Sequence, residues 1–568
     1  MPEEFSLEER ARLKPYVSNT DKRIFALTNL PEEVKAAVFS RYSRTDKGLR
    51  RVLLEEFIEN PVAGFEHVVG HINETEEDPA QKVVKVQRAR EFFDKVLVGY
   101  GDDSVADMGG AHIAVEEVSQ VESKEIEDNR LGAYLEKSSR FVYLDQKKNG
   151  EFQYFHEPTV VSHPQLGAVF VKAMDGLFEI YSQLLRPVRE IFRKSFPLEE
   201  FRFKHPETGE EVVYSQIRDG KLKEAAKSAY TFTIRAKTAD TIRDLLPLST
   251  LTNIGVYCNG RQFERLLSKL YSSELFESNQ VAIEMHGELN QVIPSLVKRA
   301  QANSFEIGVR QNLEQFVKER LGSIPLVVPN KPVELLDFEP EEVAEKKIVT
   351  DILFEADRVY GHTKQQIRRY VDELSVGERR NIITSYTNGR RNRRDKPGRA
   401  FEAVSYDFAV LSTSSTFRDL DRMRMVTPFH PRFTTRYGFD SFSRLREMGF
   451  SESVDRALEI SANAESTLAP WFGPASQYAV VNGALYPFSQ RFNLREAFHY
   501  FELRSSRQGH PTYRKITQEM FRQIEKVHPF LASLIGFVDL NDYGLERSDA
   551  AVRTAVKESK LGIKPKDY

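Results

Sequence analysis

The segment NLREAFHYFELR, residues 493–504, combines an amide, two guanidinium groups and an imidazole within one helical pattern. Its leucine and phenylalanine residues at i, i+4 and i+7 predict an apolar stripe that packs against a core. Asn493 and Arg504 lie 11 residues apart, almost three full turns, and so fall on one polar row. Arginine donates a planar fork of hydrogen bonds, so this row can bind an anionic or imide-bearing ligand. The alternative is an amphipathic helix whose polar side chains face solvent and pair with one another.

A second segment, DNRLGAYLEKSSR at residues 128–140, ends in Glu136, Ser138 and Arg140. A hydroxyl two residues before an arginine can present both donors to one phosphate where the backbone is irregular. Sequences of this kind are also common in solvated loops. The segment is therefore a candidate phosphate site that needs support from elsewhere in the chain.

Both segments belong to a pattern of elements that occurs twice along the chain. In the first half, residues 111–118 predict a strand. Ser119, with Glu122 three residues on, predicts the cap of a helix that ends at Arg130.

The second half repeats this order of elements. Residues 403–411 predict a strand by their β-branched and aromatic side chains. Thr416 and Asp419 then predict the cap of a helix over FRDLDRMR. Farther along, Asn259 in the first half and Asn493 in the second each open another helical pattern.

The repeat divides the 568 residues into two domains, since the chain is too long for one ordinary core. We expect an N-terminal domain over residues 1–323, with an insertion near 198–222, and a C-terminal domain over 343–568. Residues 324–342 combine prolines with acidic side chains and are predicted to be the linker. Helical patterns dominate and strands are few, so the predicted class is α+β.

The overall composition excludes several classes of protein. The net charge is −3, so no global field attracts the chain to nucleic acid or to a membrane, and any phosphate recognition must be local. No run of about 18 apolar residues is present, which excludes a membrane-spanning helix. The charged N-terminus lacks the apolar stretch of a signal peptide, and Cys258 is the only cysteine. We therefore expect a cytoplasmic protein without a disulfide or a metal site.

The helical segment 493–504 resembles the C-terminal motif of the flavin-dependent thymidylate synthase (ThyX) family, in which N-x-R precedes a polar position and F-x-L-R. The resemblance implies that Asn493, Arg495 and His499 contact FAD. It also implies that Arg504 contacts the uracil of dUMP and favours its ionised form. Arg504 is therefore the candidate catalytic residue.

The family's other signature, R-H-R-x-x-S-x-N-E-x-S-x-R, is divided between the two halves. Arg422 and Arg424 match its opening, with Met423 in place of the histidine. The resemblance assigns Arg422 to both dUMP and the cofactor, and Arg424 to the cofactor. The end of the signature, which contacts dUMP in the family, is matched only in the first half, at Glu136, Ser138 and Arg140.

Arg243 adds to the first-half set, since IRDLLPL resembles the family's A-R-x-x-L-P segment, whose arginine binds the phosphate of dUMP. Its second-half counterpart is Gln477, and the first-half counterpart of Arg504 is Leu270. The uracil-side residues are therefore kept only in the second half, and the phosphate-side residues only in the first. Because the family shares each dUMP site between subunits, we infer a duplicated chain that keeps one composite site.

The resemblance implies reductive methylation of dUMP to dTMP, with FAD as cofactor and NADPH and methylenetetrahydrofolate as co-substrates. It implies two tandem ThyX-like domains, each a mainly antiparallel sheet with packed helices, and a homodimer would rebuild the family's four-domain assembly. Cys258 lies in the apolar stretch NIGVYCN and is expected in the core, which disfavours a cysteine nucleophile. Arg504 would stabilise negative charge as it develops on the pyrimidine.

Two alternatives remain open. Met423 replaces the family's histidine, so the protein can be a flavoprotein of this fold that acts on another uracil nucleotide or on RNA. The basic run GRRNRRDKPGR, residues 389–399, also permits a non-catalytic nucleotide- or RNA-binding protein, although the net charge disfavours nucleic acid. Because the run directly precedes Phe401 and Glu402, it is otherwise a solvated loop or a binding site for a cofactor's pyrophosphate.

Overall fold

The computed structural model describes residues 4–60, 103–138, 140 and 142–561, which form two compact units. Unit 1 and unit 2 are each described by themselves below. Unit 1 consists of Met1–Val118, Glu122–Lys137 and Thr252–Ile324. Unit 2 consists of Ser119–Val121, Ser138–Leu251 and Pro325–Tyr568.

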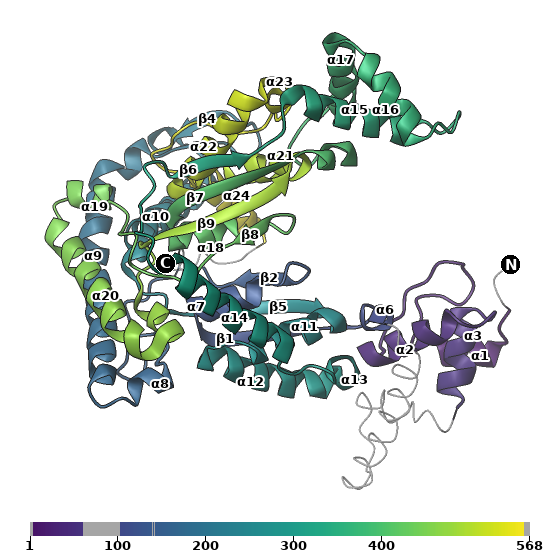
Figure 1. Cartoon of the computed structure of the whole chain (residues 1–568), viewed down its shortest axis with the longest axis horizontal. Coiled ribbons are helices and arrows are strands. Elements are labelled where there is room, and N and C mark those ends of the chain that lie inside the picture. The colour runs from purple at the N-terminus through teal and green to yellow at the C-terminus, as the bar shows by residue number, and fades with distance from the viewer. Residues whose placement is uncertain (1–3, 61–102, 139, 141, 562–568) are drawn as a thin grey trace, which may run out of the picture. The chain divides into compact units, whose positions relative to one another are not determined.

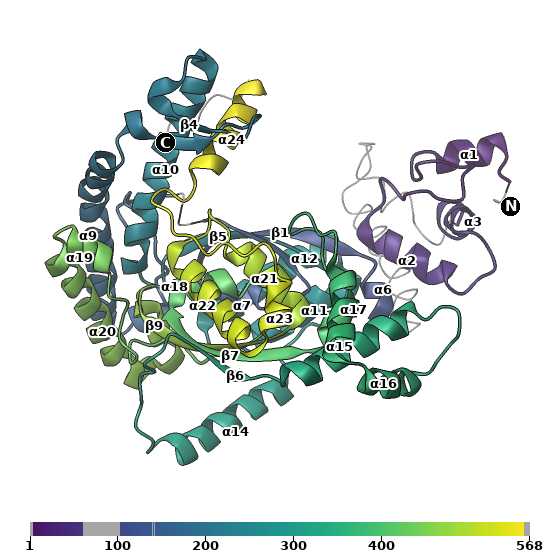
Figure 2. The ribbon, with the colours of Figure 1, turned by 90° about the horizontal axis from the view of Figure 1, so that it is seen from above.

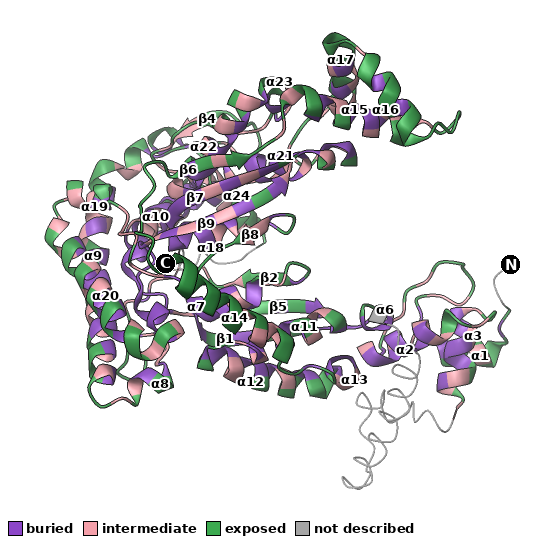
Figure 3. Cartoon of the chain, viewed as in Figure 1, coloured by how far each residue is buried: buried purple, intermediate pink, exposed green. Residues whose placement is uncertain are grey.

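Unit 2 is built around a four-stranded sheet of order β6-β7-β9-β8 (Figure 1). Its antiparallel strands are β6 (Val333–Asp337), β7 (Ser405–Thr413), β8 (Thr427–Phe429) and β9 (Leu485–Asn493). Alternate side chains of β7 and β9 are buried, among them Phe408 and Phe492, whose rings stack 5.6 Å apart (Figure 3). This period of two places one face of the sheet in the core.

The helix α21 (Leu494–Arg504) continues directly from β9. Asn493 is its N-cap, and the Asn493 side chain accepts a hydrogen bond of 2.9 Å from the backbone nitrogen of Glu496. Leu494, Phe498 and Phe501 are buried, which confirms the predicted apolar stripe. The polar side chains of α21 are thereby set at fixed positions over the sheet.

The helix α18 (Ser414–Leu420) follows β7 in the same way, but the predicted cap at Thr416 is wrong. The N-cap is Thr413, whose hydroxyl accepts a hydrogen bond of 3.2 Å from the backbone nitrogen of Thr416. The strand runs to Thr413 and turns directly into the helix, so the first threonine of the run satisfies the free amide.

Long helices complete unit 2. α9 and α20 lie side by side, and α24 lies along α10 (Figures 1 and 2). The helices of unit 2 are α8 (Pro158–Val161), α9 (Leu166–Ser195), α10 (Gly220–Ile242), α15 (Glu341–Ala356), α16 (Lys364–Glu373), α17 (Val376–Thr387), α18, α19 (Ser443–Glu447), α20 (Ser451–Phe472), α21, α22 (Pro511–Val527), α23 (Pro529–Ser533) and α24 (Ser548–Lys560). Its short 3-10 turns are η4 (Leu198–Glu200), η5 (Tyr214–Gln216), η6 (Arg243–Leu245), η7 (Arg399–Ala403) and η8 (Gly473–Ala479).

Unit 1 contains a three-stranded sheet of order β1-β5-β2. Its elements are α1 (Leu7–Leu13), α2 (Glu32–Tyr42), α3 (Leu49–Val52), η1 (Leu53–Ile58), α6 (Asp103–Ala106), β1 (Gly110–Ser119), α7 (Gln120–Glu127), β2 (Ala133–Glu136), β5 (Leu251–Asn259), α11 (Gly260–Tyr271), α12 (Phe276–Val292), α13 (Pro294–Val297) and α14 (Ser304–Leu321). Asn259 caps α11 as Asn493 caps α21, and Cys258 is buried as expected.

The same order of elements therefore occurs in both sheets: strand, helix, short strand, then strand and helix. β1, α7, β2, β5 and α11 correspond to β7, α18, β8, β9 and α21. This order confirms the predicted repeat and the α+β class.

Two segments between these elements differ from a plain repeat. The predicted insertion near 198–222 contains the antiparallel hairpin of β3 (Arg202–Lys204) and β4 (Glu211–Val213). The predicted linker 324–342 contains β6, which pairs with β7 and buries Val333, so this part of it belongs to the sheet. The domain boundaries themselves stay a prediction. Within the described ranges, no helix is long and apolar enough to cross a membrane.

Candidate functional site

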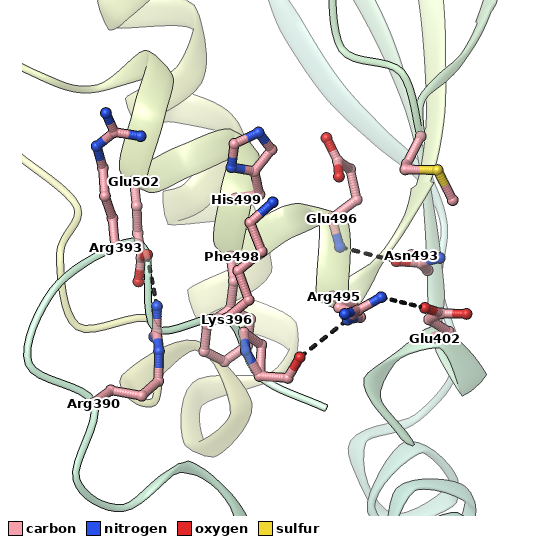
Figure 4. Close-up of a pocket in the computed structure, with 12 residues that line it drawn as sticks. Arg390, Arg393, Lys396, Glu402, Asn493, Arg495, Glu496, Phe498, His499 and Glu502 are labelled. Atoms are coloured by element: carbon pink, nitrogen blue, oxygen red, sulfur yellow. Dashed lines mark hydrogen bonds and ion pairs between the residues drawn. The ribbon is translucent and has the colours of Figure 1, made fainter. Parts of the chain in front are cut away.

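A pocket in unit 2 opens where α21 faces the basic run 389–399 (Figure 4). Its open space is about 500 Å³, including the part that is open to solvent. Residues from α21, from the basic run and from two neighbouring segments line it: Arg390, Arg393, Lys396, Pro397, Glu402, Met425, Asn493, Arg495, Glu496, Phe498, His499 and Glu502. The pocket thus contains all three residues of α21 and its cap that were predicted to contact a flavin. We call it the α21 pocket.

Arg495 fixes one edge of the α21 pocket. Its Nε donates to the carbonyl oxygen of Pro397 at 3.0 Å, and its Nη1 forms an ion pair of 2.7 Å with Glu402. Asn493 uses its side-chain oxygen as the helix cap, which leaves its amide NH2 group as the part able to donate to a ligand. Arg495 therefore ties the basic run to the start of α21.

The basic run is an ordered wall of the α21 pocket. Asp395 accepts hydrogen bonds from the backbone nitrogens of Arg391, at 2.7 Å, and Asn392, at 3.3 Å, which closes a tight turn. Arg390 pairs with the buried Glu502 at 2.7 Å and lies over the ring of Phe498. Arg390 anchors the run, and the cations of Arg393 and Lys396 line the cavity.

Burial controls the protonation of the two titratable groups that α21 presents to the pocket. Burial, together with the cations of Lys396, Arg393 and Arg504, lowers the pKa of His499 to about 4, so the imidazole is neutral at pH 7. Lys396 and Arg393 are drawn near His499 in Figure 4. Burial raises the pKa of Glu496 to about 7, against the opposing effect of Lys396, Arg495 and Arg504. The Oε1 atom of Glu496 is buried and has no hydrogen-bond partner among the described residues.

A second group of charged residues in unit 2 contains the predicted phosphate-side arginines. Arg140 donates from Nε and Nη2 to the two carboxylate oxygens of Asp240, at 2.9 and 3.1 Å. Arg243 donates from Nη2 to Asp419 at 3.1 Å, and its Nε lies 3.6 Å from Asp244. Asp419 belongs to α18, so residues of the first and second halves meet directly here.

Two carboxylates of this group, those of Asp240 and Asp419, are held ionised. Burial raises the pKa of Asp240, but Arg140 and Arg547 outweigh burial and hold that pKa well below its usual range. The pKa of Asp419 is also held well below its usual range, because Arg243, Arg140 and Arg422 outweigh its burial. Arg422 follows Asp419 by three residues, and its charge is among those that lower the pKa of Asp419.

Arg504 interacts with residues of both the α21 pocket and the charged group around Arg140. Its guanidinium lies 5.8 Å from the ring centroid of Tyr513, and Tyr513 in turn acts electrostatically on Arg140. Its charge also lowers the pKa of His499 and opposes the raised pKa of Glu496 in the α21 pocket. The Nε atom of Arg504 is buried without a hydrogen-bond partner within the described part of the chain. An unsatisfied buried donor of this kind is costly unless a ligand completes it.

A second pocket, of about 990 Å³ including its open part, lies beside Arg140 and Tyr513. We call it the α24 pocket, because α10, α22 and α24 supply most of its walls. Its lining consists of Arg140, Ser228, Ala229, Phe232, Gln508, Tyr513, Arg547, Ala550, Ala551, Thr554, Ala555 and Glu558.

The remaining predicted residues are placed as follows. Arg422 and Arg424 are exposed at the end of α18, whereas Met423 between them is buried. The hydroxyl of Ser138 accepts a hydrogen bond of 3.3 Å from the backbone nitrogen of Arg140. Glu136 belongs to unit 1, where the hydroxyl of Ser123 donates to it at 3.2 Å.

Several residues of the site were not predicted as site residues. Asp240 and Arg547 meet although they lie 307 positions apart, and no local spacing signals such a pair. Asp419 was noted only as part of a helix cap. Glu496 directly follows the N-x-R motif. A carboxylate next to the polar residues of that motif was the only sequence feature that could have pointed to it. No cluster of metal-ligating side chains is found in the ranges that the structure describes.

Comparison with known proteins agrees with the repeat. The family model described as thymidylate synthase complementing protein matches residues 65–295 and 350–530, more than half of the chain. A UPF0159 protein of Chlamydia muridarum is 34% identical over 562 residues, which cover 96% of this chain and 97% of that protein. A UPF0159 protein of Thermoplasma acidophilum is 30% identical and covers 92% of this chain and 99% of its own length.

Among solved structures, this chain is similar to a UMP/dUMP methylase, PolB from Streptomyces cacaoi, bound with 5-Br dUMP. The match has 16% sequence identity and a TM-score of 0.28, and it covers 36% of this chain and 93% of that structure.

Proposed function

Since the chain belongs to the family of thymidylate synthase complementing proteins, we propose that it is a flavin-dependent methyltransferase that converts dUMP to dTMP. FAD is the proposed cofactor, and NADPH and methylenetetrahydrofolate are the proposed co-substrates. One composite site, built from residues of both halves, performs the reaction.

One observation supports this proposal most strongly. The first half supplies Arg140 and Arg243, and these lie in unit 2 with Asp419, Arg422 and Arg504 of the second half. The two halves keep complementary parts of the family's motifs, and the complementary parts occur in one compact unit. Independent loss of function in the two halves gives no reason for such an arrangement.

In this site Arg140 and Arg243 bind the phosphate of dUMP, with Ser138 as a further proposed ligand. Each guanidinium already contacts a carboxylate, which fixes its plane and leaves other N–H groups to donate to the ligand. Arg504 and Arg422 bind the uracil. The unsatisfied Nε of Arg504 is a donor for the negative charge that develops on the pyrimidine, which is electrostatic stabilisation of the transition state.

The α21 pocket fits the proposed cofactor. Asn493, Arg495 and the neutral His499 can donate to or accept from the polar edge of a flavin, and Arg424 is a further proposed contact. Arg393 and Lys396 carry the positive charge that a pyrophosphate requires. Asn493, Arg495 and His499 would hold FAD there, and FAD in its reduced form would supply a hydride.

Two measurements test the proposal. Purified protein reconstituted with FAD is expected to be yellow and to lose its flavin absorbance under NADPH. A strain that requires thymidine is expected to grow without thymidine when it expresses the chain. Soluble protein that takes up no FAD would sink the enzyme hypothesis.

A second candidate function follows from Met423. It is buried, and it stands where the family has a histidine, so the segment beside Arg422 lacks an imidazole. We therefore also consider a flavoprotein of the same fold that acts on another uracil nucleotide. Protein that binds FAD and UMP but fails to restore growth without thymidine would favour this second function.

A further inference from the structure

The C-terminal helix α24 lies outside the part of the chain that the family model matches, which ends at residue 530. It nevertheless packs along α10, the helix that carries Asp240 (Figure 2). Ala551 and Val552 of α24 are buried. The helix is therefore an integral part of unit 2 that lies beyond the residues matched by the family model.

Ion pairs fix the start of α24. Glu546 binds Lys237 of α10 at 3.0 Å, and Asp549 binds Arg507 at 2.6 Å. Between them, Nη2 of Arg547 donates to Asp240 at 2.8 Å. Arg547 is buried, and its neighbours in the chain hold it in place.

Asp240 is shared by two arginines. Its Oδ2 atom accepts both from Arg547 and, at 3.1 Å, from Nη2 of Arg140. One carboxylate therefore lies between two guanidinium groups, so Arg140, Arg547 and Asp240 taken by themselves carry one more positive than negative charge. Burial, with Arg140 and Arg243, lowers the pKa of Arg547 to about 10, although Asp240 opposes this effect. Arg547 is still charged at pH 7, and an incoming anion relieves the repulsion between Arg140 and Arg547, which share one carboxylate.

Arg140 and Arg547 also line the same α24 pocket, together with Tyr513 and Gln508. The rest of the lining combines alanines of α10 and α24 and Phe232 with Ser228, Thr554 and Glu558. The pocket thus offers two cations and a phenol together with apolar surface. This combination suits a phosphate monoester attached to a nucleoside.

We propose that Arg547 is a third phosphate-binding arginine of the nucleotide site, and that α24 closes the phosphate end of that site. The inference rests on the proposed function for the identity of the nucleotide. It adds a ligand from a segment beyond the family match and makes the C-terminal helix part of substrate binding.

Calorimetric titration of dUMP into the full chain tests the role of Arg547. Arg547→Ala is expected to weaken dUMP binding by about tenfold to a hundredfold, the range for losing one charge-assisted hydrogen bond. Arg547→Lys is expected to keep part of the affinity. Arg553→Ala, on the exposed side of the same helix, is the matched control and is expected to bind dUMP as the wild type does.

Deoxyuridine, which lacks the phosphate, separates a phosphate contact from a general loss of structure. Arg547→Ala is expected to leave deoxyuridine binding unchanged, and circular dichroism reports whether the variant keeps its helices. If Arg547→Ala folds, an unchanged dUMP affinity overturns the proposal. If Arg547→Ala disrupts folding, Arg547→Lys decides: a reduced dUMP affinity with unchanged deoxyuridine affinity supports the phosphate contact, and the wild-type dUMP affinity overturns it.

The outcomes also separate this inference from the proposed function. If the wild type binds UMP but not dUMP, the proposed substrate is wrong and the same variants are titrated with UMP. If the wild type binds neither nucleotide nor inorganic phosphate, both proposals fail. Equal weakening of nucleotide binding and deoxyuridine binding by Arg547→Ala assigns the residue to folding and overturns the phosphate role.

Discussion

The helices α11 and α21 occupy equivalent positions in the two units, and they differ in what they present. Each follows a strand, and each has an asparagine N-cap that accepts from the backbone nitrogen three residues on, at 2.9 Å. In unit 1 both side chains of the Asn-x-Arg pair have an internal partner: Asn259 and Arg261 donate hydrogen bonds to Asp107, at 3.0 and 3.3 Å. In unit 2 Arg495 binds Glu402 and Asn493 faces the α21 pocket.

The last turn of each helix shows the same difference. Leu270 of α11 is fully buried in the hydrophobic core of unit 1, whereas Arg504 of α21 lies over Tyr513 with a buried, unsatisfied donor. Capping and burial of the apolar stripe keep both helices folded. Of the two helices, only α21 keeps an arginine with a buried donor in its last turn, so the fold of this repeat does not depend on that polar group.

The largest expected effect comes from making the second helix like the first. Arg504→Leu copies the residue of α11 and removes the donor to the developing charge on the pyrimidine. Formation of dTMP is expected to fall by about 10²–10³-fold, as on removal of one oxyanion donor. Product formation at saturating dUMP measures this. FAD uptake is the internal control and should persist, since Arg504 is assigned to the uracil.

If the site is composite, substitution of a first-half residue should also impair the site, here through dUMP binding. Arg140→Ala is expected to weaken dUMP binding by up to about a hundredfold, because it removes a bidentate cation and leaves Asp240 to repel the phosphate. Arg193→Ala, an exposed arginine of α9, is the matched control. Normal dUMP affinity in a folded Arg140→Ala protein would show that the halves do not share one site.

A smaller effect distinguishes the two Asn-x-Arg pairs. Arg495→Ala is expected to weaken FAD binding by about tenfold, through loss of a cation and release of the basic run at Pro397. Arg261→Ala makes the same change in unit 1, where the arginine is exposed and bound to Asp107, and should leave FAD affinity unchanged. Fluorescence titration of FAD compares the two. Equal losses would contradict the assignment of the cofactor to α21 alone.

The sequence allowed α21, its cap and its apolar stripe to be predicted, because all three follow from spacing within a dozen residues. The cap of α18 was misplaced by three residues, since Thr413, Ser414, Ser415 and Thr416 all carry hydroxyls and only the end of β7 selects the first. The strand β6 was missed because its pairing with β7 is a contact between distant segments.

The candidate site divides in the same way. Motif resemblance pointed to Arg140, Arg243 and Arg504 as members of one site. The proposed role of each follows from the arginine side chain itself and needs no knowledge of the neighbouring residues. The carboxylates that orient them could not be predicted, because Asp240 is one acidic residue among many on a helix. Its partnership with Arg140 and Arg547 depends on how α10, α24 and the loop at Arg140 pack in three dimensions.

The smallest expected effect concerns Glu496, a buried residue of α21 that lines the α21 pocket. The equivalent residue of α11 is Gln262. The folded-state pKa of Glu496 is about 7, above its ordinary value of 4.5, so the folded protein holds this proton at pH values where the unfolded chain has lost it. Stability from this group is therefore highest below pH 4.5, falls as the pH rises from 4.5 to 7, and is constant above 7. The loss is on the order of 3 kcal/mol at most.

Glu496→Gln, which matches the uncharged amide at the α11 position, is expected to remove this fall. Thermal unfolding at pH 5 and pH 8 measures the difference, and the variant should gain stability at pH 8 relative to the wild type but not at pH 5. Glu525→Gln, an exposed carboxylate of α22, is the control and should follow the wild type at both values. A wild-type pH dependence that survives in Glu496→Gln would mean that another group is responsible, and that α21 tolerates an ionised carboxylate at this position as readily as α11 tolerates an amide.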